Sequence, residues 1–441
     1  MRTPCVIFLV LALASTTLAA DGPVAQPVTL TLQEAVARAL VYSHRVAEQN
    51  ARIAGAEASV LGREAASRPL VSVSAGYTRT NHVDEFGVPT SGGAFRTIYP
   101  DIPDNYHSRL DVQWPLYTSG RVESLTRSAR LELQAVQNDR ETTRSDVRLD
   151  VTRAYWTLVT ARANLRVVDE SVRRMDAHLA DVREQLRVGL LPPSDVLTVE
   201  AQTSRQRLQA IEAKAAEDVA TADLRRLLGL EPGTTLTLDA PLDVLVEPAP
   251  DLSTLKDEAR RSRPELKALA VRVESARARE QAAMAQNRPM LGVLGGVDYA
   301  NPNPRIFPRQ DVWRTSWDVS VSVGWTLWNG GRTKAEVAEA DAAARATQAR
   351  LQELDRALVF EVEQRALELD AARAAIMTAN EAVRAATEAR RVLGERFGAG
   401  VATSTDVLDA QVALLQAELD RTRALASAHL AQARLERALG R

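Results

Sequence analysis

The chain has 441 residues and a formal net charge of −2 at pH 7, with 45% apolar and only 4% aromatic residues. The charge gives no reason to expect a nucleic acid or a strongly acidic partner. So few aromatic residues are more typical of a packed helical array than of a thick globular core.

Residues 1–20 have the pattern of a secretory signal peptide: Arg2, an apolar run and a small-residue end at Ala19-Ala20. The apolar run is shorter than the roughly 20 residues that a membrane-spanning helix needs, and no later stretch reaches that length. The one cysteine, Cys5, lies inside this leader. We therefore expect an exported mature chain with no disulfide, no thiol catalyst and no cysteine metal ligand.

The first helical pattern covers residues 31–68. It opens with Thr31 followed by Glu34, the spacing of a capping box, and Pro69 ends it. An interruption near Ser43 divides this stretch into two helices.

After this helical stretch the hydrophobic period changes from 3.6 to 2, which predicts strands at 70–80 and 108–117. A polar loop is expected between them, from about residue 81 to 107. Each strand has small polar residues on one face and apolar residues on the other.

Residues 121–188 contain no glycine or proline and form a helical pattern of 68 residues, or roughly 100 Å at about 1.5 Å per residue. Gly189 stops this helix, and a second helix is predicted at 194–228. A connector at 229–250 completes a first structural repeat, residues 21–250.

Residues 251–441 repeat this order. Asp195 and Asp406 occupy equivalent positions, as do Gly189 and Gly400, at a constant offset of 211 (406 minus 195). The predicted elements of this second repeat are helices at 253–288, strands at 290–299 and 316–328, a long helix at 332–397 and a helix at 405–439.

Four strands of about ten residues with one polar and one apolar face are typical of an outer-membrane barrel. A soluble sandwich also alternates, but aromatic residues gather in and beside these strands, as at a membrane interface. Four strands cannot close a barrel, so the chain must oligomerise if it spans a membrane. The predicted girdle residues are Tyr77, Trp114, Tyr299, Trp317, Trp325 and Trp328.

The long helices allow a second interpretation. Val362, Leu369, Ile376 and Val383 recur every seven residues, which is the spacing of a left-handed supercoil. Periodicity alone therefore favours a plain coiled-coil dimer, and only the membrane-type strands argue against it.

Asp406 and Asp409 lie three residues apart at the start of the last helix and therefore share a face. One interpretation is that such acids complement the helix dipole, with Ser404 or Thr405 as the cap. The other is a ring of carboxylates that favours cations at a constriction. The first tip has Asp195 but Thr198 in place of the second acid.

The sequence shows no catalytic, metal or cofactor site. The five histidines, His44, His82, His107, His178 and His429, are scattered without ligand spacing and are expected at the surface. No glycine-rich phosphate loop follows a strand. We therefore expect no enzyme activity and no cofactor.

The signal peptide, the duplicated half, the Leu30–Ala35 opening and the Gly-x5-Asp-Val-Leu tips resemble the TolC family of outer-membrane efflux proteins. The resemblance implies a mainly α fold with a small β part: a homotrimer with a 12-stranded transmembrane β-barrel and a long-helix α-barrel of 12 helices. It also implies a mixed α/β belt built from the N-terminal segment, residues 231–252 and the C-terminal end.

The resemblance further implies an outer-membrane exit duct of a tripartite efflux system, with a long periplasmic part. The expected partners are outer-membrane lipid, a periplasmic adaptor protein and an inner-membrane transporter of the RND or ABC type. Type I protein secretion is an alternative role, and a secreted coiled-coil scaffold without a pore is an alternative of another class. The adaptor-contact residues implied at the tips are Val188, Gly189, Leu190, Ala399, Gly400 and Val401.

The tips also depart from the family pattern. Family members carry a tyrosine and an arginine that latch the closed end where this chain has Phe397 and Ala402. Neither side chain makes polar bonds, so the closed state here needs other contacts. The gate and selectivity residues are expected to be Asp195, Asp406, Asp409 and Phe397.

Overall fold

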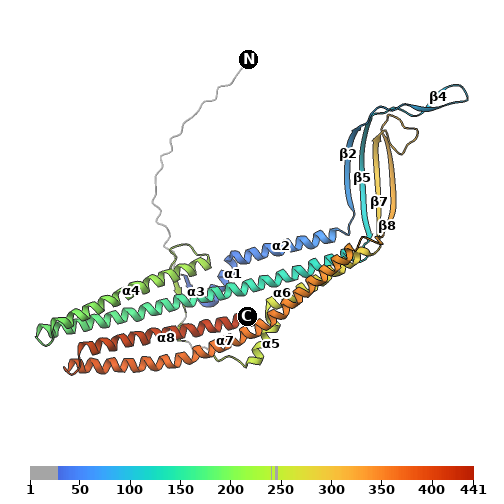
Figure 1. Cartoon of the computed structure of the whole chain (residues 1–441). Coiled ribbons are helices and arrows are strands. Elements are labelled where there is room, and N and C mark those ends of the chain that lie inside the picture. Colours follow the sequence, from blue (N-terminus) through green and yellow to red (C-terminus); the bar gives the residue numbers. More distant parts are fainter. Residues whose placement is uncertain (1–27, 240, 244–246) are drawn as a thin grey trace, which may run out of the picture.

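The computed structural model describes residues 28–239, 241–243 and 247–441; the predicted signal peptide lies outside them. Long helices form an elongated bundle, and a sheet of strands extends from one end of it (Figure 1). The predicted fold class is thereby confirmed: the chain is mainly helical, with a small β part. Among the described residues, no helix combines the length and apolarity needed to cross a bilayer.

The first repeat places its two short helices before its two long strands and its two long helices after them. Its helices are α1 (Leu32–Tyr42), α2 (His44–Ala65), α3 (Arg121–Arg187) and α4 (Pro193–Leu228). Its strands are β1 (Val28–Leu30), β2 (Leu70–Arg79), β3 (Phe86–Pro89), β4 (Phe95–Tyr99), β5 (Asp104–Tyr117) and β6 (Leu236–Leu238).

The second repeat has the same order of helices and long strands, without counterparts of β1, β3, β4 and β6. Its elements are α5 (Leu252–Ser262), α6 (Pro264–Met284), a 3₁₀ turn η1 (Ala285–Asn287), β7 (Met290–Asn301), β8 (Arg314–Gly324), α7 (Arg332–Gly398) and α8 (Ser404–Leu439).

The strands differ from the sequence prediction by shifts of one to four residues at several ends and by an extra hairpin. The segment predicted as a polar loop contains the antiparallel pair β3–β4, because a turn closed by the Thr90 N–H and the Ala94 carbonyl (2.8 Å) brings two short apolar runs together. β5 begins at Asp104, four residues early, because its outward part pairs with β2. β8 ends at Gly324, because Trp325 turns its indole N–H to the Asn287 carbonyl (3.0 Å).

The duplication is visible in the backbone. Positive φ angles recur at the offset of 211: the long helices begin after Gly120 (φ 86°) and Gly331 (φ 87°). Gly229 and Gly440 (φ 62° and 82°) end α4 and α8 in the same way. At Gly440 an added Cβ would also lie 3.1 Å from the backbone N of Arg263, so this position needs glycine for space as well as for conformation.

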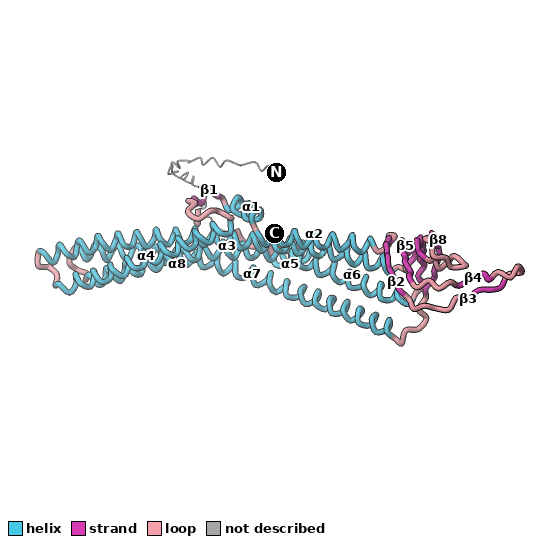
Figure 2. The backbone as a smooth tube through the Cα atoms, turned by 90° about the horizontal axis from the view of Figure 1, so that it is seen from above, coloured by secondary structure: helices cyan, strands magenta, loops and turns pink. Residues whose placement is uncertain are grey.

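The helices form a single row. On the side of the tips, neighbours pack in the order α4, α3, α8, α7; on the side of the sheet, the order is α2, α3, α6, α7. Figures 1 and 2 show this row running the length of the bundle. α3 and α7 have 67 residues each, and α2 and α4 both pack against α3. Each repeat has its own apolar core halfway along the row, around Leu158 and Leu224 in the first and Leu358 and Leu369 in the second.

The four long strands form one antiparallel sheet in the order β2, β5, β7, β8. The two repeats meet where β5 pairs with β7. β2 and β8 are the edge strands, so one side of each has no strand partner within the described part of the chain. Beside the helices, β1 and β6 pair in parallel, and the Tyr155 hydroxyl donates to the Leu30 carbonyl (3.2 Å).

Candidate functional site

The two hairpin tips end the helical row, and the same hydrogen-bond pattern closes both. In the α3–α4 turn the N–H of Gly189 donates to the Leu186 carbonyl (2.9 Å), and the N–H of Leu190 donates to the Gln185 carbonyl (2.9 Å). The α7–α8 turn repeats this pattern around Gly400. The six residues predicted to contact an adaptor are all exposed: Val188, Gly189, Leu190, Ala399, Gly400 and Val401.

Behind the tips, one apolar cluster joins the two hairpins. It contains buried residues of α3, α4, α7 and α8: Met175, Leu179, Val182, Val196, Val199, Phe397, Val407 and Leu408. Phe397 is only 6% exposed, and Ala402 packs against the same cluster. Apolar packing therefore occupies the two positions where the sequence lacks a polar latch.

His178 and His429 are buried, so the prediction that every histidine lies at the surface is wrong for these two. Both lie where α3 meets α8. Nε2 of His178 lies 3.1 Å from Oγ of Ser404, and the His429 ring stacks on Trp156 with centroids 3.7 Å apart. Burial lowers the pKa of both histidines. Spacing along the sequence does not reveal such a pair, because each partner comes from the other repeat.

The tip aspartates differ from one another. Asp406 forms a capping box with Thr403: its carboxylate accepts the Thr403 hydroxyl and N–H, at 2.7 and 2.8 Å. These bonds lower the pKa of Asp406. The predicted cap at Ser404 or Thr405 is therefore wrong, because Thr403 is the residue with the extended backbone that a cap needs.

At the first tip, Pro192 occupies the cap position and offers neither a hydroxyl nor an N–H. Asp195 is therefore free of a capping box and accepts only the Ser194 hydroxyl (3.2 Å) among the described contacts. Asp406 and Asp409 are exposed, whereas Asp195 is half-buried.

The sheet has two chemically different faces. The cross-strand register places Val73, Leu110, Val297 and Trp317 in one row, and these side chains are exposed on one face. The opposite face consists mainly of serine, glycine and charged residues. An exposed apolar face against a polar one is the pattern of a membrane barrel with a wet interior.

Aromatic residues form two bands on the apolar face. The outward band contains Tyr77, Tyr106 and Tyr299 with Trp313, whose rings contact one another, and Trp317 lies nearby. At the helical end, Trp114 lies in β5, and Trp325 and Trp328 follow β8; all three side chains are exposed. Tyr106 and Trp114 lie eight residues apart in β5, roughly 26 Å at about 3.3 Å per residue, which matches the height of a barrel's apolar belt.

The band at the helical end also fixes the helix-to-strand junctions. The indole N–H of Trp114 donates to the Ser67 carbonyl (3.2 Å) where α2 ends. That of Trp325 donates to the Asn287 carbonyl (3.0 Å) where η1 ends. Both repeats therefore use one tryptophan for the same purpose.

On the polar face, Arg109 joins three carboxylates across the sheet. Its guanidinium lies 2.7 Å from Asp111, 2.5 Å from Asp298 and 3.1 Å from Asp318. Gly296 lies beneath it, and a Cβ there would collide with the guanidinium. The sequence analysis missed this cluster, because its members lie up to 209 residues apart and meet only through the strand order.

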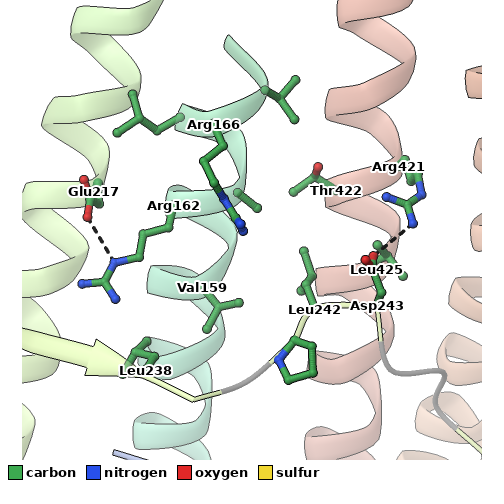
Figure 3. Close-up of a pocket in the computed structure, with 14 residues that line it drawn as sticks. Val159, Arg162, Arg166, Glu217, Leu238, Leu242, Asp243, Arg421, Thr422 and Leu425 are labelled. Atoms are coloured by element: carbon green, nitrogen blue, oxygen red, sulfur yellow. Dashed lines mark hydrogen bonds and ion pairs between the residues drawn. The ribbon is translucent and has the colours of Figure 1, made fainter. Parts of the chain in front are cut away.

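A cavity of about 710 Å³ lies halfway along the bundle, between α3, α8 and the connector (Figure 3). Arg162 pairs with Glu217 (3.1 Å) and Arg421 with Asp243 (3.0 Å) on its walls. Each of these arginines therefore has a carboxylate partner on the cavity wall. The described residues contain no group of three or more acidic or histidine side chains placed to hold a metal ion.

Residues 35–230 and 255–441 match the family model described as outer membrane efflux protein. Protein CyaE of Bordetella pertussis is 29% identical over 286 residues, or 63% of this chain, which spans 56% of that relative's length. Outer membrane protein TolC of Vibrio cholerae is 23% identical over 87% of this chain and 84% of its own length. The solved structure of CusC superposes with a TM-score of 0.79 at 16% identity, covering 92% of this chain and 91% of that chain.

Proposed function

The chain belongs to the outer membrane efflux protein family, and on that premise we infer an exit duct that carries solutes from the periplasm to the exterior. It is an outer-membrane channel protein with a long periplasmic part. The observation that carries this reading is the sheet, whose apolar face is bounded by two aromatic bands while its other face is polar.

We propose that three copies form the duct. The same two edges are open at every level: β2, α2 and α4 on one side, β8 and α7 on the other. An open sheet edge in lipid leaves backbone groups without partners, so β8 of one copy must pair with β2 of the next. Four strands per chain then give a 12-stranded barrel.

The helical edges support the same assembly. Leu197, Leu208 and Ile211 are exposed on one face of α4, and Phe360 and Leu367 are exposed on α7. Exposed apolar side chains at both edges of one row are surfaces that neighbouring copies would cover. A two-chain coiled coil would use only one of these edges.

The tips support a role in docking and gating. Exposed Val188, Leu190 and Val401 form apolar contact points for a periplasmic adaptor, which would link the duct to an inner-membrane transporter. Asp195, Asp406 and Asp409 would form the cation-favouring constriction, and Phe397 would hold the hairpins together behind it.

The test is single-channel recording in planar bilayers. Replacing Asp406 and Asp409 with alanine should weaken the preference for cations, while Glu418→Ala, away from the tips, should not. Unchanged selectivity would contradict a constriction formed by these carboxylates. The complete absence of channels would contradict the duct itself.

A further inference from the structure

In the loop between β7 and β8, residues 302–313, the part before Trp313 folds back onto the polar face of the sheet, whereas the Trp313 ring packs against Tyr106 and Tyr299 on the apolar face. Nδ2 of Asn303 donates to the Arg314 carbonyl and to the Ser316 hydroxyl, both at 3.0 Å. Ser316 belongs to the row of Arg109 and Asp298, on the polar face. The start of the loop is therefore fixed to the side that faces away from lipid.

Two arginines of the loop extend this attachment. Arg305 pairs with the Asp318 carboxylate (2.7 Å) and donates to the Trp317 carbonyl (2.9 Å). On the other side of β7, Arg309 donates to the Asn105 side-chain carbonyl (3.3 Å), which is also on the polar face, and to the Tyr99 hydroxyl (2.9 Å). The loop thus spans β7 from β8 to β5.

Burial along β7 shows what the loop covers. On the polar face, Ala300, next to the start of the loop, is 2% exposed, and Gly296 is buried beneath Arg109. On the apolar face, Val297 and Tyr299 between them are 43% and 49% exposed. Farther toward the helices the polar face is open, since Ser320 and Ser322 of β8 are exposed.

The Arg109 cluster anchors the loop to the sheet. Asp318 is shared between Arg109 of β5 and Arg305 of the loop. Two arginines therefore meet three carboxylates, Asp111, Asp298 and Asp318, which leaves one negative charge per chain beneath the loop. Partly buried ion networks of this kind hold a geometry better than isolated surface pairs.

We propose that loop 302–313 is a specificity-determining restriction at the outward end of the duct, held over the lumen by Arg305 and Asp318. Three copies narrow the exit and select the transported solutes by size. This inference rests on the proposed function, because the polar face is a lumen only in the closed barrel.

The test uses a single cysteine at Ser320→Cys on the polar face, because the described residues contain no cysteine. Intact cells are treated with a small water-soluble maleimide or with one that carries a polyethylene glycol chain. Two variants release the loop: Arg305→Ala, and a replacement of residues 304–311 by Gly-Gly. Both should raise the rate at which the large reagent labels the cysteine roughly tenfold and leave the labelling rate of the small reagent unchanged.

Arg79→Ala is the matched control. Arg79 pairs with Asp104 (3.2 Å) at the same end of the sheet, but this ion pair lies on the apolar face, so its loss should not change either rate. Equal rates of the large reagent in the parent and in both loop variants would overturn the restriction. A second single-cysteine protein, Val321→Cys, places the thiol on the apolar face. Labelling of this cysteine without labelling of Ser320→Cys would overturn the duct itself.

Discussion

Single residues distinguish the two tips of this duplicated chain. Proline at position 192 and threonine at position 403 occupy equivalent places, and only the threonine caps its helix. Asp406 is consequently tied to the backbone, whereas Asp195 is not. The sequence predicted both acids and their positions, but it did not identify the capping residue, because Thr403, Ser404 and Thr405 are all competent caps until the backbone selects one.

Thr403→Ala should destabilise the start of α8 by about 1 kcal/mol, because it removes the hydroxyl partner of Asp406. Hydrogen exchange of the amides in the first turn of α8 should become faster. The first turn of α4 has no side-chain cap and is the internal control. Unaltered exchange at α8 would mean that the capping box does not stabilise the tip.

His178 should make the tips sensitive to acid. Its folded-state pKa lies below the ordinary value of 6.5 because burial between Ser404 and Phe397 disfavours the charged ring. Asp181, one turn away on α3, favours the charge, and Arg174, which pairs with Glu418 (2.8 Å), lies on the same side of α3.

Because the unfolded chain binds the proton more readily, the contribution of His178 to stability is complete above pH 6.5 and is lost as the pH falls through the folded pKa. The melting temperature of the extracted assembly should therefore fall between pH 7.5 and acidic pH, and less so in His178→Gln. An equal dependence of the melting temperature on pH in the parent and in His178→Gln would contradict this role of His178.

The two repeats share their secondary-structure elements more closely than they share individual residues. The change of period, the glycine stops and the offset of 211 were sufficient to predict the long helices and the four strands of the sheet. The β3–β4 hairpin escaped prediction because its strands have only four and five residues amid polar turns. The attachment of loop 302–313 to the polar face escaped prediction because its anchors lie on strands β5 and β8, which no local pattern relates.

The junctions between helices and strands should depend on two tryptophans. Trp114→Phe and Trp325→Phe each remove one indole hydrogen bond, at a cost of about 1 kcal/mol, while keeping the aromatic band. The assembly of the double variant should dissociate at a lower temperature when samples are incubated at graded temperatures before electrophoresis. Trp328→Phe is the control, since the Trp328 indole makes no hydrogen bond in the described part of the chain; an equal effect there would point to lipid contacts alone.

The seven-residue repeat of α7 should contribute strongly to stability. Leu369 is 2% exposed in the core of the second repeat, so Leu369→Ala should cost roughly 2–5 kcal/mol, whereas Leu369→Met should be tolerated. Thermal unfolding followed by circular dichroism measures both. Similar losses for the two variants would mean that the position responds to any change of shape.

At the scale of the whole molecule, one chain forms one segment of the proposed duct wall. Its sheet and its helical row end at the same two edges, and the exposed apolar side chains of α4 and α7 lie on those edges. Alternation along the strands predicted a membrane barrel and the need for several copies. The number of chains in the assembly, three, came only from the family resemblance, because no pattern within one chain indicates how many copies close the barrel.

The most direct test of this account is the mass of the assembly extracted from outer membranes without heating, determined by native mass spectrometry. Three copies of the chain, present in the outer-membrane fraction, are the predicted result. A monomer, or a dimer found in the soluble periplasmic fraction, would contradict the closed duct on which the functional proposals depend.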